Sequence, residues 1–213
     1  MDFADNRLRC SPDQHTFRII LVRHGQTEAN EKYLLQGASD GPLTLTGIAQ
    51  AEKLGRVFSH YHVNRVISSD LQRAQKTAFE IARHHQLEVE STSLAREWNC
   101  GEWDGKPANE FRKMLKESGL PVSALHPPGG ETLSEVRQRA QILIRGLIQD
   151  SFGKTVVICA HGDFMRMMLS HMLGLEIDQA EFFHFDNASF SVLEFDGQHW
   201  RVYTINRVAT DCI

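Results

Sequence analysis

The stretch IILVRHGQTEAN, residues 19–30, points most directly to the fold of this chain. Its apolar run, Ile19 to Val22, comes directly before Arg23, His24 and a glycine. A continuous run of Ile, Leu and Val is typical of a strand buried in a parallel sheet. Positive groups at the end of a buried strand are costly unless an anion or a carboxylate lies beside them. We therefore expect an anionic partner at the carboxyl end of this strand.

Composition and charge narrow the classes of protein. The chain has 213 residues, 41% of them hydrophobic, which suits one α/β domain better than two. Its formal net charge is -4 without a block of like charges, so we expect neither nucleic acid nor a membrane as partner. No signal-peptide pattern and no run of about 18 apolar residues occurs, and we expect a cytoplasmic protein.

The cysteines and most of the histidines do not suggest a metal site. The cysteines Cys10, Cys100, Cys159 and Cys212 are widely spaced, without a CxxC pair. This spacing argues against both a disulfide framework and a zinc site, and we expect reduced thiols that pack as small hydrophobic groups. The histidines away from the strand ends, such as those within 60–62 and 84–85, are expected on helix ends and surfaces. No metal is predicted.

Strands and helices alternate along the chain. Strands are predicted over 17–22, 65–69, 88–92, 155–160, 189–195 and 199–205, and helices over 46–61, 71–85, 108–119, 132–150 and 161–173. Thr46 and Asp70 are the expected caps of the first two helices, and Asp196-Gly197 favours a tight hairpin. The alternation predicts a three-layer α/β/α fold with a mostly parallel, doubly wound sheet and an antiparallel edge strand.

The remaining segments define the expected domain organisation. Residues 1–16 are predicted to be a loosely attached leader before a single domain over 17–213. Within that domain the turn-rich segment 95–107 is expected to be an irregular loop. The two helices that follow it are separated by the Pro- and Gly-containing turn 127–130, and we expect them to cover a cleft. The cap insertion would then span about 98–150.

Four side chains that bind anions well fall at the ends of predicted strands: Arg23, His24, Arg73 and His161. Ligands of a doubly wound sheet bind beyond the carboxyl ends of the strands, where helix N-termini add backbone donors. Arginine has the fork geometry that suits phosphate oxygens, so a phosphoryl dianion is the best fit. Each residue alone has an ordinary structural explanation, and only the set of four indicates a site.

Phosphoryl chemistry at this site would need a nucleophile and an acid. A neutral imidazole nitrogen can attack phosphorus and later release the phosphoryl group to water, without a metal. A carboxyl group must still protonate the departing alkoxide. Glu97, in the irregular loop, is the candidate for this acid, and Asp163 and Asp70 are its competitors.

The opening motif is similar to the RHG signature of the histidine phosphatase (phosphoglycerate mutase-like) superfamily. Further segments resemble the same family in the right order: LLQGASDGPLTLTGIAQA (34–51), VISSDLQRAQKTA (66–78), REWNCGEWDGK (96–106), PPGGETL (127–133) and VVICAHGDFMR (156–166). The resemblance covers residues 17–206. An RHG tripeptide alone is a weak signal, whereas this ordered set is specific.

The resemblance implies a role for each residue of the set. His24 would be the residue that becomes phosphorylated, and Glu97 would be the general acid and then the general base. Arg23, Arg73 and His161 would bind the phosphoryl group. No cofactor is implied.

Four more positions match the family. Asn30 and Gln36 correspond to positions that contact the phosphoryl group or the incoming oxygen, and Gly37 and Gly162 would allow close backbone approach. The acid phosphatase and phytase branch has an aspartate directly after the second histidine as its proton donor. Here Gly162 occupies that place, which favours Glu97 as the acid.

The resemblance also narrows the expected activity. The mutases have an ERHYG-like segment where this chain has REWNCGEW, and a longer cap. The chain more closely resembles the short broad-specificity phosphatases and alpha-ribazole phosphatase, while PPGGETL is also similar to fructose-bisphosphatase-like members. We expect a phosphomonoesterase acting on a small phosphorylated metabolite. The alternatives are a phosphoglycerate mutase or other phosphoryl transferase, and a low-turnover phosphoprotein-binding signalling module. The substrate and the oligomeric state stay open, with a homodimer as one candidate.

Overall fold

A single six-stranded sheet forms the centre of the molecule. The computed structural model describes residues 3–209, so Cys212 lies outside the described part. The strands are β1 (Phe17–Arg23), β2 (Arg65–Ser69), β3 (Val89–Thr92), β4 (Thr155–Ala160), β5 (Ser189–Phe195) and β6 (Trp200–Val208). Their order in the sheet is β3-β2-β4-β1-β5-β6. The two most apolar strands, β1 and β4, are therefore neighbours at the centre, as their composition requires.

The pairing confirms a mostly parallel sheet with an antiparallel edge. β1, β4, β2 and β3 run parallel to one another, whereas β5 is antiparallel to both β1 and β6. The β5–β6 hairpin turns at Gly197, whose φ of 95° lies in the left-handed region that glycine adopts without strain.

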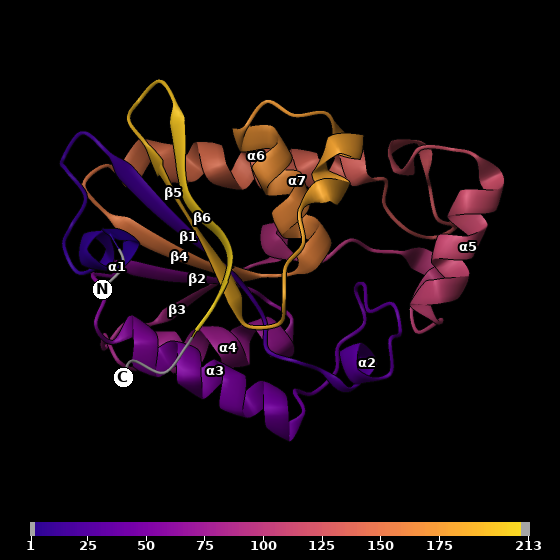
Figure 1. The fold of residues 1–213 in the computed structure, drawn as a ribbon, viewed down its shortest axis with the longest axis horizontal. Coiled ribbons are helices and arrows are strands. Elements are labelled where there is room, and N and C mark those ends of the chain that lie inside the picture. The colour runs from indigo at the N-terminus through magenta and orange to yellow at the C-terminus, as the bar shows by residue number, and fades with distance from the viewer. Residues whose placement is uncertain (1–2, 210–213) are drawn as a thin grey trace.

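Helices cover both faces of the sheet and complete the predicted three layers (Figure 1). The helices α3 (Leu45–Phe58) and α4 (Gln72–Ala82) pack on one face, and α6 (Leu133–Asp150) and α7 (Gly162–Met172) on the other. Side chains alternate across a strand, so β1 feeds both cores, with Ile19 in one and Ile20 in the other.

The first helix cap differs from the prediction by half a turn. Thr44, not Thr46, caps α3, and its hydroxyl accepts a hydrogen bond from the backbone N–H of Gly47 at 3.0 Å. The helix begins at Leu45, whose side chain is 87% exposed. An exposed leucine breaks the apolar period, which is why the pattern placed the start too late.

The predicted cap of the second helix was wrong. α4 begins after Leu71 without a side-chain cap, because the carboxylate of Asp70 is held instead by Arg96 through two hydrogen bonds of 2.7 and 2.6 Å. A bidentate pair with arginine is stronger than a bond to a neutral amide. Asp40, from a distant loop, accepts the N–H of Gln72 in its place.

The segment before β1 is held more firmly than its composition suggested. It contains a short helix, α1 (Phe3–Leu8), and Leu8 is buried in the core under α3 and α4. The guanidinium of Arg18 donates to the carbonyl oxygen of Cys10 at 2.8 Å. The expectation of a loose leader is therefore corrected, because its partners lie on the sheet and not in the nearby sequence.

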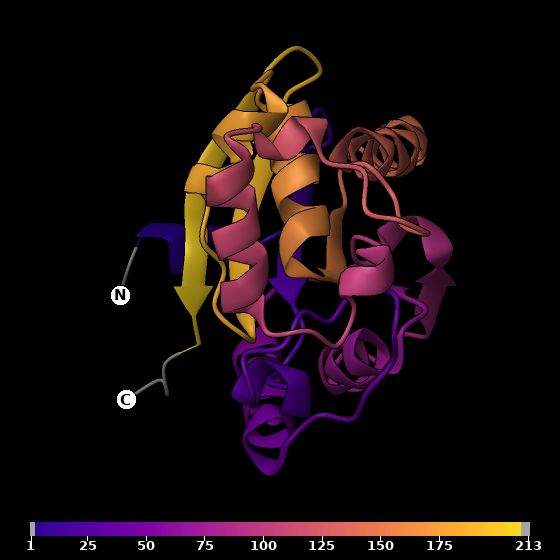
Figure 2. The ribbon, with the colours of Figure 1, turned by 90° about the vertical axis from the view of Figure 1, so that its right-hand side faces the viewer.

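The cap is smaller than the expected insertion over 98–150. Helix α5 (Ala108–Ser118) stands away from the sheet in Figure 1 and lies toward the viewer in Figure 2. α6 belongs to the main body, since its buried residues pack with those of α7 in one core. Phe111 of α5 packs edge-on against Trp98 and Trp103, with ring centroids 5.7 and 5.5 Å apart.

Short helical turns lie between the main helices and strands. A four-residue helix, α2 (Glu28–Glu31), follows β1, and 3-10 turns are found at η1 (Ser93–Ala95), η2 (Gly101–Trp103), η3 (Val122–Ala124) and η4 (Ile177–Phe182). The segment 95–107 is otherwise irregular, as predicted. Among residues 3–209, no helix has the length and apolar character needed to cross a membrane.

Candidate active site

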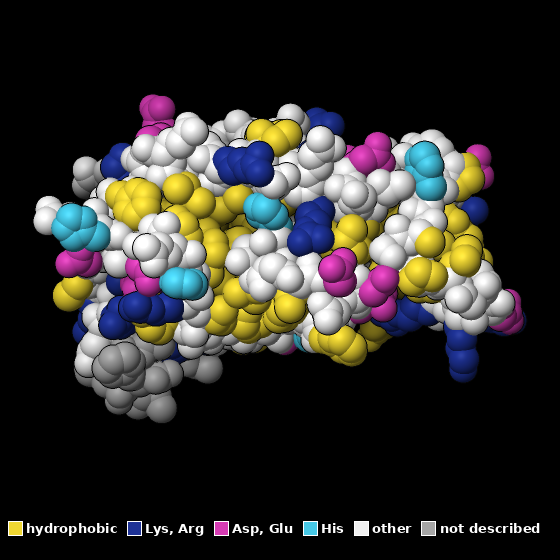
Figure 3. All heavy atoms as spheres, turned by 90° about the horizontal axis from the view of Figure 1, so that it is seen from above, with side chains coloured by type: hydrophobic (Ala, Val, Ile, Leu, Met, Phe, Trp, Pro, Cys, Tyr) yellow, Lys and Arg dark blue, Asp and Glu magenta, His cyan; other side chains and the backbone are white. Residues whose placement is uncertain are grey.

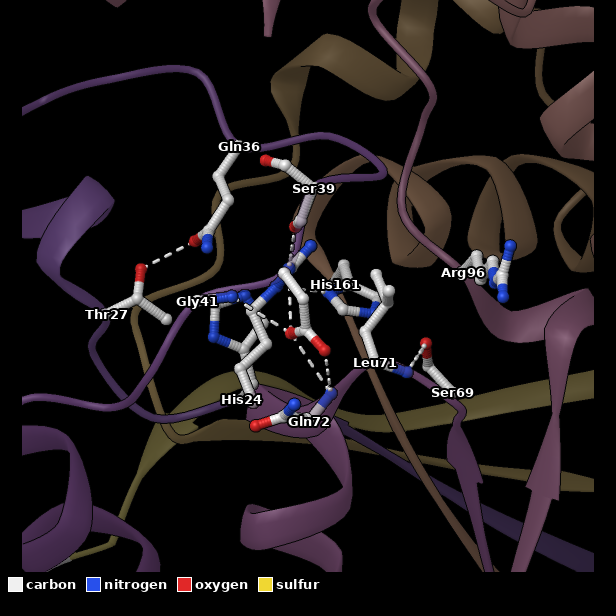
Figure 4. A network of polar contacts seen from close by, with 12 residues as sticks. His24, Thr27, Gln36, Ser39, Gly41, Ser69, Leu71, Gln72, Arg96 and His161 are labelled. Carbon is white, nitrogen blue, oxygen red and sulfur yellow. Dashed lines mark hydrogen bonds and ion pairs between the residues drawn. The ribbon is translucent and has the colours of Figure 1, made fainter. Parts of the chain in front are cut away.

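The sheet order brings the predicted strand-end residues together. β2, β4 and β1 are neighbours and parallel, so their carboxyl ends share one edge. The rings of His24 and His161 lie there with centroids 5.1 Å apart, and the loop through Gln36 and Ser39 passes over them (Figure 4). The clustering expected from the sequence is present in the structure.

His24 is buried and electrically neutral. Its Nδ1 lies 2.8 Å from the carbonyl oxygen of Gly25. A carbonyl can only accept, so Nδ1 carries the hydrogen and Nε2 keeps a free lone pair. Burial, followed by the charges of Arg73 and Arg23, holds the pKa of His24 well below its usual 6.5. The imidazole can therefore act as a nucleophile through Nε2.

Arg73 is a fully buried organiser of the site. Its Nη1 and Nη2 donate to the carbonyl oxygens of Ser39 and Gly37 at 2.7 and 2.8 Å, so the loop wraps around the guanidinium. Its Nε donates to Nδ1 of His161 at 3.2 Å. One side chain thus ties the second histidine to the loop that covers the site.

Two buried donors at this edge have no partner among the described residues. Arginine cannot accept a hydrogen bond, so Nδ1 of His161 is the acceptor and its Nε2 carries hydrogen. That Nε2 and the Nε of Arg23 are both buried and unpaired. An unsatisfied buried donor costs about 1–3 kcal/mol. An anion that reached both donors would therefore satisfy them.

Glu97 lies at the N-terminus of α7. Its Oε1 accepts the backbone N–H groups of Trp98, Asp163 and Phe164 at 2.9, 3.1 and 3.0 Å. Burial, followed by the charge of Asp163, raises the pKa of Glu97 above its usual value. A carboxyl group with a raised pKa is suited to hold and deliver a proton near neutral pH.

Gly162 leaves the space between Glu97 and Arg23 open. A Cβ at Gly162 would lie 3.8 Å from both the Nε of Arg23 and the Oε2 of Glu97. A larger side chain would project between them. The glycine thus allows the carboxyl group of Glu97 and the guanidinium of Arg23 to face the same space.

The two rival acids are engaged elsewhere. The carboxylate of Asp70 is held by Arg96, whose hydrogen bonds lower the pKa of Asp70. The carboxylate of Asp163 forms an ion pair with Arg166, with 2.6 Å between Oδ1 and Nη1. Both of these carboxylates are thus paired with an arginine, whereas burial raises the pKa of Glu97.

Thr27, a buried residue that the sequence analysis did not select, orients the side-chain amides of Asn30 and Gln36. The N–H of Thr27 donates to Oδ1 of Asn30 at 3.1 Å, and the hydroxyl of Thr27 accepts the N–H of Asn30. The hydroxyl hydrogen goes to Oε1 of Gln36 at 2.6 Å, as drawn in Figure 4. Both amide oxygens accept a hydrogen bond, so the NH₂ group of each amide points away from Thr27 and can donate elsewhere.

Gly37 lies where its loop packs closely against the backbone of Trp98. A Cβ there would come within 2.6 Å of the carbonyl oxygen of Trp98. The N–H of Gly37 donates to Oδ1 of Asp104 at 3.1 Å, and its carbonyl accepts from Arg73. The glycine thus allows the close approach expected of it, but toward the neighbouring loop, and its N–H is occupied.

Arg139 also contacts the site, and the sequence did not indicate it. Arg139 on α6 donates to the carbonyl oxygens of Leu94, Arg96 and Glu97 and pairs with Glu131. It therefore braces the loop that carries Glu97. No local sequence pattern distinguishes Arg139, because it occupies a partly exposed position on α6 where an arginine is common.

We find no candidate metal centre elsewhere in the part of the chain that the structure describes. Within residues 3–209, no three His, Cys, Asp or Glu side chains gather closely enough to hold a metal ion. On the face shown in Figure 3, basic and acidic side chains are interspersed. A groove of about 410 Å³ lies between α3 and α4, and one of about 380 Å³ between α6 and the β2–β3 edge. Both are lined by residues outside the site.

The arrangement defines a class of protein: a doubly wound α/β protein with two histidines and two arginines gathered at the carboxyl ends of its parallel strands. Residues 19–208 match the model of the histidine phosphatase superfamily, branch 1. The chain belongs to this superfamily. The resemblance seen in the sequence is thereby confirmed.

Individual relatives show how far the similarity extends. The chain is 30% identical over 197 residues to phosphoserine phosphatase 1 of Hydrogenobacter thermophilus, covering 89% of this chain and 92% of that protein. It is 37% identical over 147 residues to fructose-2,6-bisphosphatase TIGAR of Xenopus tropicalis, covering 65% of this chain. The chain matches about half of the TIGAR length, with 54% covered.

A solved structure agrees in fold over nearly the whole chain. Mycobacterial glucosyl-3-phosphoglycerate phosphatase, solved with VO3, superposes with a TM-score of 0.82 and 26% sequence identity. The match covers 90% of this chain and 99% of that chain. The architecture is thus that of phosphatases in this superfamily.

Proposed function

We propose that this protein is a phosphomonoesterase that hydrolyses a small phosphorylated metabolite through a phosphohistidine on His24. The observation that carries the proposal is the pair of unfilled buried donors, His161 Nε2 and Arg23 Nε, beside a neutral imidazole. A phosphoryl group supplies the acceptor oxygens that these donors lack. The relatives that are phosphatases support the same chemistry.

In the first step, Nε2 of His24 attacks phosphorus and the bond from phosphorus to the ester oxygen breaks. Glu97 gives its proton to the departing alkoxide. The charge on the phosphoryl oxygens is stabilised by Arg23, Arg73 and His161.

In the second step, water hydrolyses the phosphohistidine. The Glu97 carboxylate takes a proton from water, the oxygen bonds to phosphorus, and the bond from phosphorus to Nε2 breaks. The products are inorganic phosphate and neutral His24. The amides of Asn30 and Gln36 contact the phosphoryl group through their NH₂ groups. No step requires a metal or a cofactor.

The test combines turnover with trapping of the intermediate. Wild-type protein should release phosphate from a generic aryl phosphate and, after acid-free quenching, contain acid-labile phosphate. His24→Ala should show neither, whereas His60→Ala, a change at an exposed histidine, should match wild type. Equal labelling of the wild-type protein and His24→Ala would refute the assignment.

Two further assays separate the alternative functions. Isomerisation of phosphoglycerate, stimulated by a bisphosphoglycerate primer, would identify a mutase. Binding of phosphoprotein without phosphate release would identify a signalling module. A turnover screen over phosphorylated sugars, glycerates, amino acids and nucleosides then narrows the substrate.

A further inference from the structure

Residues 183–188, which we call the strap, join η4 to β5 along the end of β1. The carbonyl oxygen of Phe183 accepts from Nε of Arg166 at 2.9 Å, and that of Phe185 accepts from Nη1 of Arg23 at 2.6 Å. The N–H of Ala188 donates to the carbonyl oxygen of His24 at 3.0 Å. The strap therefore touches the phosphoryl-binding arginine and the backbone of the nucleophile.

The strap is anchored on its far side. The side chain of Asn206 on β6 accepts the N–H of Asp186 at 2.7 Å and donates to its carboxylate at 2.9 Å. Both Ala188 and Asn206 have left-handed backbones, with φ of 56° and 55°. Alanine adopts this conformation only when surrounding contacts hold it. The strap is a fixed element.

Asn187 extends from the strap into the group of amides near His24. Its Nδ2 lies 2.9 Å from Oδ1 of Asn30 and 3.3 Å from the carbonyl oxygen of His24. The two asparagines lie 157 positions apart in the sequence. A single NH₂ group therefore links the α2 turn, the end of β1 and the strap.

Hydrogen-bond chemistry determines the orientation of both amides. A backbone N–H can only donate, so the atom of Asn30 that faces the N–H of Thr27 must be its oxygen. Asn187 meets that same oxygen and must present its nitrogen. With two donors on Oδ1, the free group of Asn30 is its NH₂. That group has no partner among the described residues.

We propose that Asn187 is a positioning residue for the phosphoryl site, which holds the amide of Asn30 with its NH₂ group toward the bound phosphoryl oxygens. The inference rests on the proposed function, because it assigns Asn30 to that group. Asn187 itself touches neither phosphorus nor the nucleophilic nitrogen.

Three substitutions test the inference: Asn187→Asp, Asn187→Ala and Asn30→Ala. Asn187→Asp keeps the shape but replaces the donor with an oxygen that faces two acceptors. It should weaken the binding of inorganic phosphate, measured by calorimetry, by about tenfold. Asn30→Ala should have a similar effect. The double variant Asn30→Ala/Asn187→Ala should bind no more weakly than Asn30→Ala alone, since Asn187 acts through Asn30.

A purely structural role predicts a different result. Asn187→Ala would then lower the melting temperature while the folded fraction kept the wild-type phosphate affinity, or it would weaken phosphate binding by the same factor whether or not Asn30 is present. Either result overturns the inference. Asn109→Asp, the same change at an exposed site on α5, controls for the added charge.

Phosphate affinity also separates this inference from the proposed function. If wild-type protein binds phosphate but hydrolyses no ester, the hydrolytic function fails and the coupling between the two asparagines still decides the inference. If wild-type protein does not bind phosphate, both fail.

Discussion

Nε of Arg73 donates to Nδ1 of His161 across 3.2 Å, so a buried arginine decides which nitrogen of a buried histidine carries hydrogen. The consequence is that Nε2 of His161 is a donor, in a ring whose centroid lies 5.1 Å from that of His24. His24 has the opposite arrangement, with its hydrogen on Nδ1 held by Gly25. Two neutral imidazoles side by side therefore differ in function: one can donate a hydrogen bond and the other can donate a lone pair.

The proposed role of Glu97 as proton donor can be tested by comparing substrates with different leaving groups. Glu97→Gln should slow hydrolysis of alkyl phosphates by about 10²–10⁴-fold, because an alkoxide cannot leave without a proton. Activated aryl phosphates should be less affected in the first step, although loss of the base still slows release from His24. Asp163→Asn is the comparison. If Asp163→Asn shows the leaving-group dependence and Glu97→Gln behaves like wild type, the acid is Asp163.

The same carboxyl group should cost stability at neutral pH. The folded protein raises the pKa of Glu97, so it binds that proton more tightly than the unfolded chain does. The free energy of unfolding therefore falls as pH rises from the unfolded pKa through the folded pKa. Glu97→Gln keeps the accepting oxygen and removes the charge. Its melting temperature should exceed that of wild type at about pH 7 and not at about pH 4.

The buried histidines should weaken the fold in acid. Burial and the charge of Arg73 hold the pKa values of His24 and His161 well below 6.5, whereas the unfolded chain titrates near 6.5. Below that pH the unfolded state binds more protons, and the free energy of unfolding falls by up to about 1.4 kcal/mol per histidine per pH unit. Urea unfolding should show a shallower acid slope for His24→Gln than for wild type. Equal slopes would mean that His24 is charged in the folded protein.

Activity should survive metal removal. Two arginines and His161 lie where a metal would otherwise stabilise the phosphoryl charge, so kcat/KM for an aryl phosphate should change by less than about twofold in excess EDTA. Loss of activity on chelation, with recovery on adding one divalent ion, would show that a metal is required.

We expect Arg139 to affect hydrolysis by holding Glu97 in position. Arg139→Ala removes the hydrogen bonds to the carbonyl oxygens of the loop that carries Glu97 and breaks the ion pair with Glu131. Hydrolysis of alkyl phosphates should fall about 10–100-fold, with a smaller loss for aryl phosphates and unchanged binding of inorganic phosphate. Arg137→Ala, on the same helix, is the control. A uniform loss over all substrates would indicate a general defect of folding.

The sequence by itself determined the layers of the fold and the place of the main site. Parallel strands have their carboxyl ends at one edge, so the residues that follow β1, β2 and β4 had to lie at that edge. Arg23, Arg73 and His161 could thus be assigned to one edge of the sheet from strand direction, while the sheet order that makes their strands neighbours came from the tertiary structure. The covering helices followed from their apolar period.

Only the tertiary structure decided the polar contacts that join distant segments. Asp70 was a reasonable cap by its position, yet Arg96 holds it, and Asp40 takes over from another loop. Asn187 and Asn30 are joined across 157 positions. Hydrophobic periodicity repeats along an element and is visible in the sequence. A hydrogen bond depends on the distance and angle of two groups, and those exist only once the chain has folded.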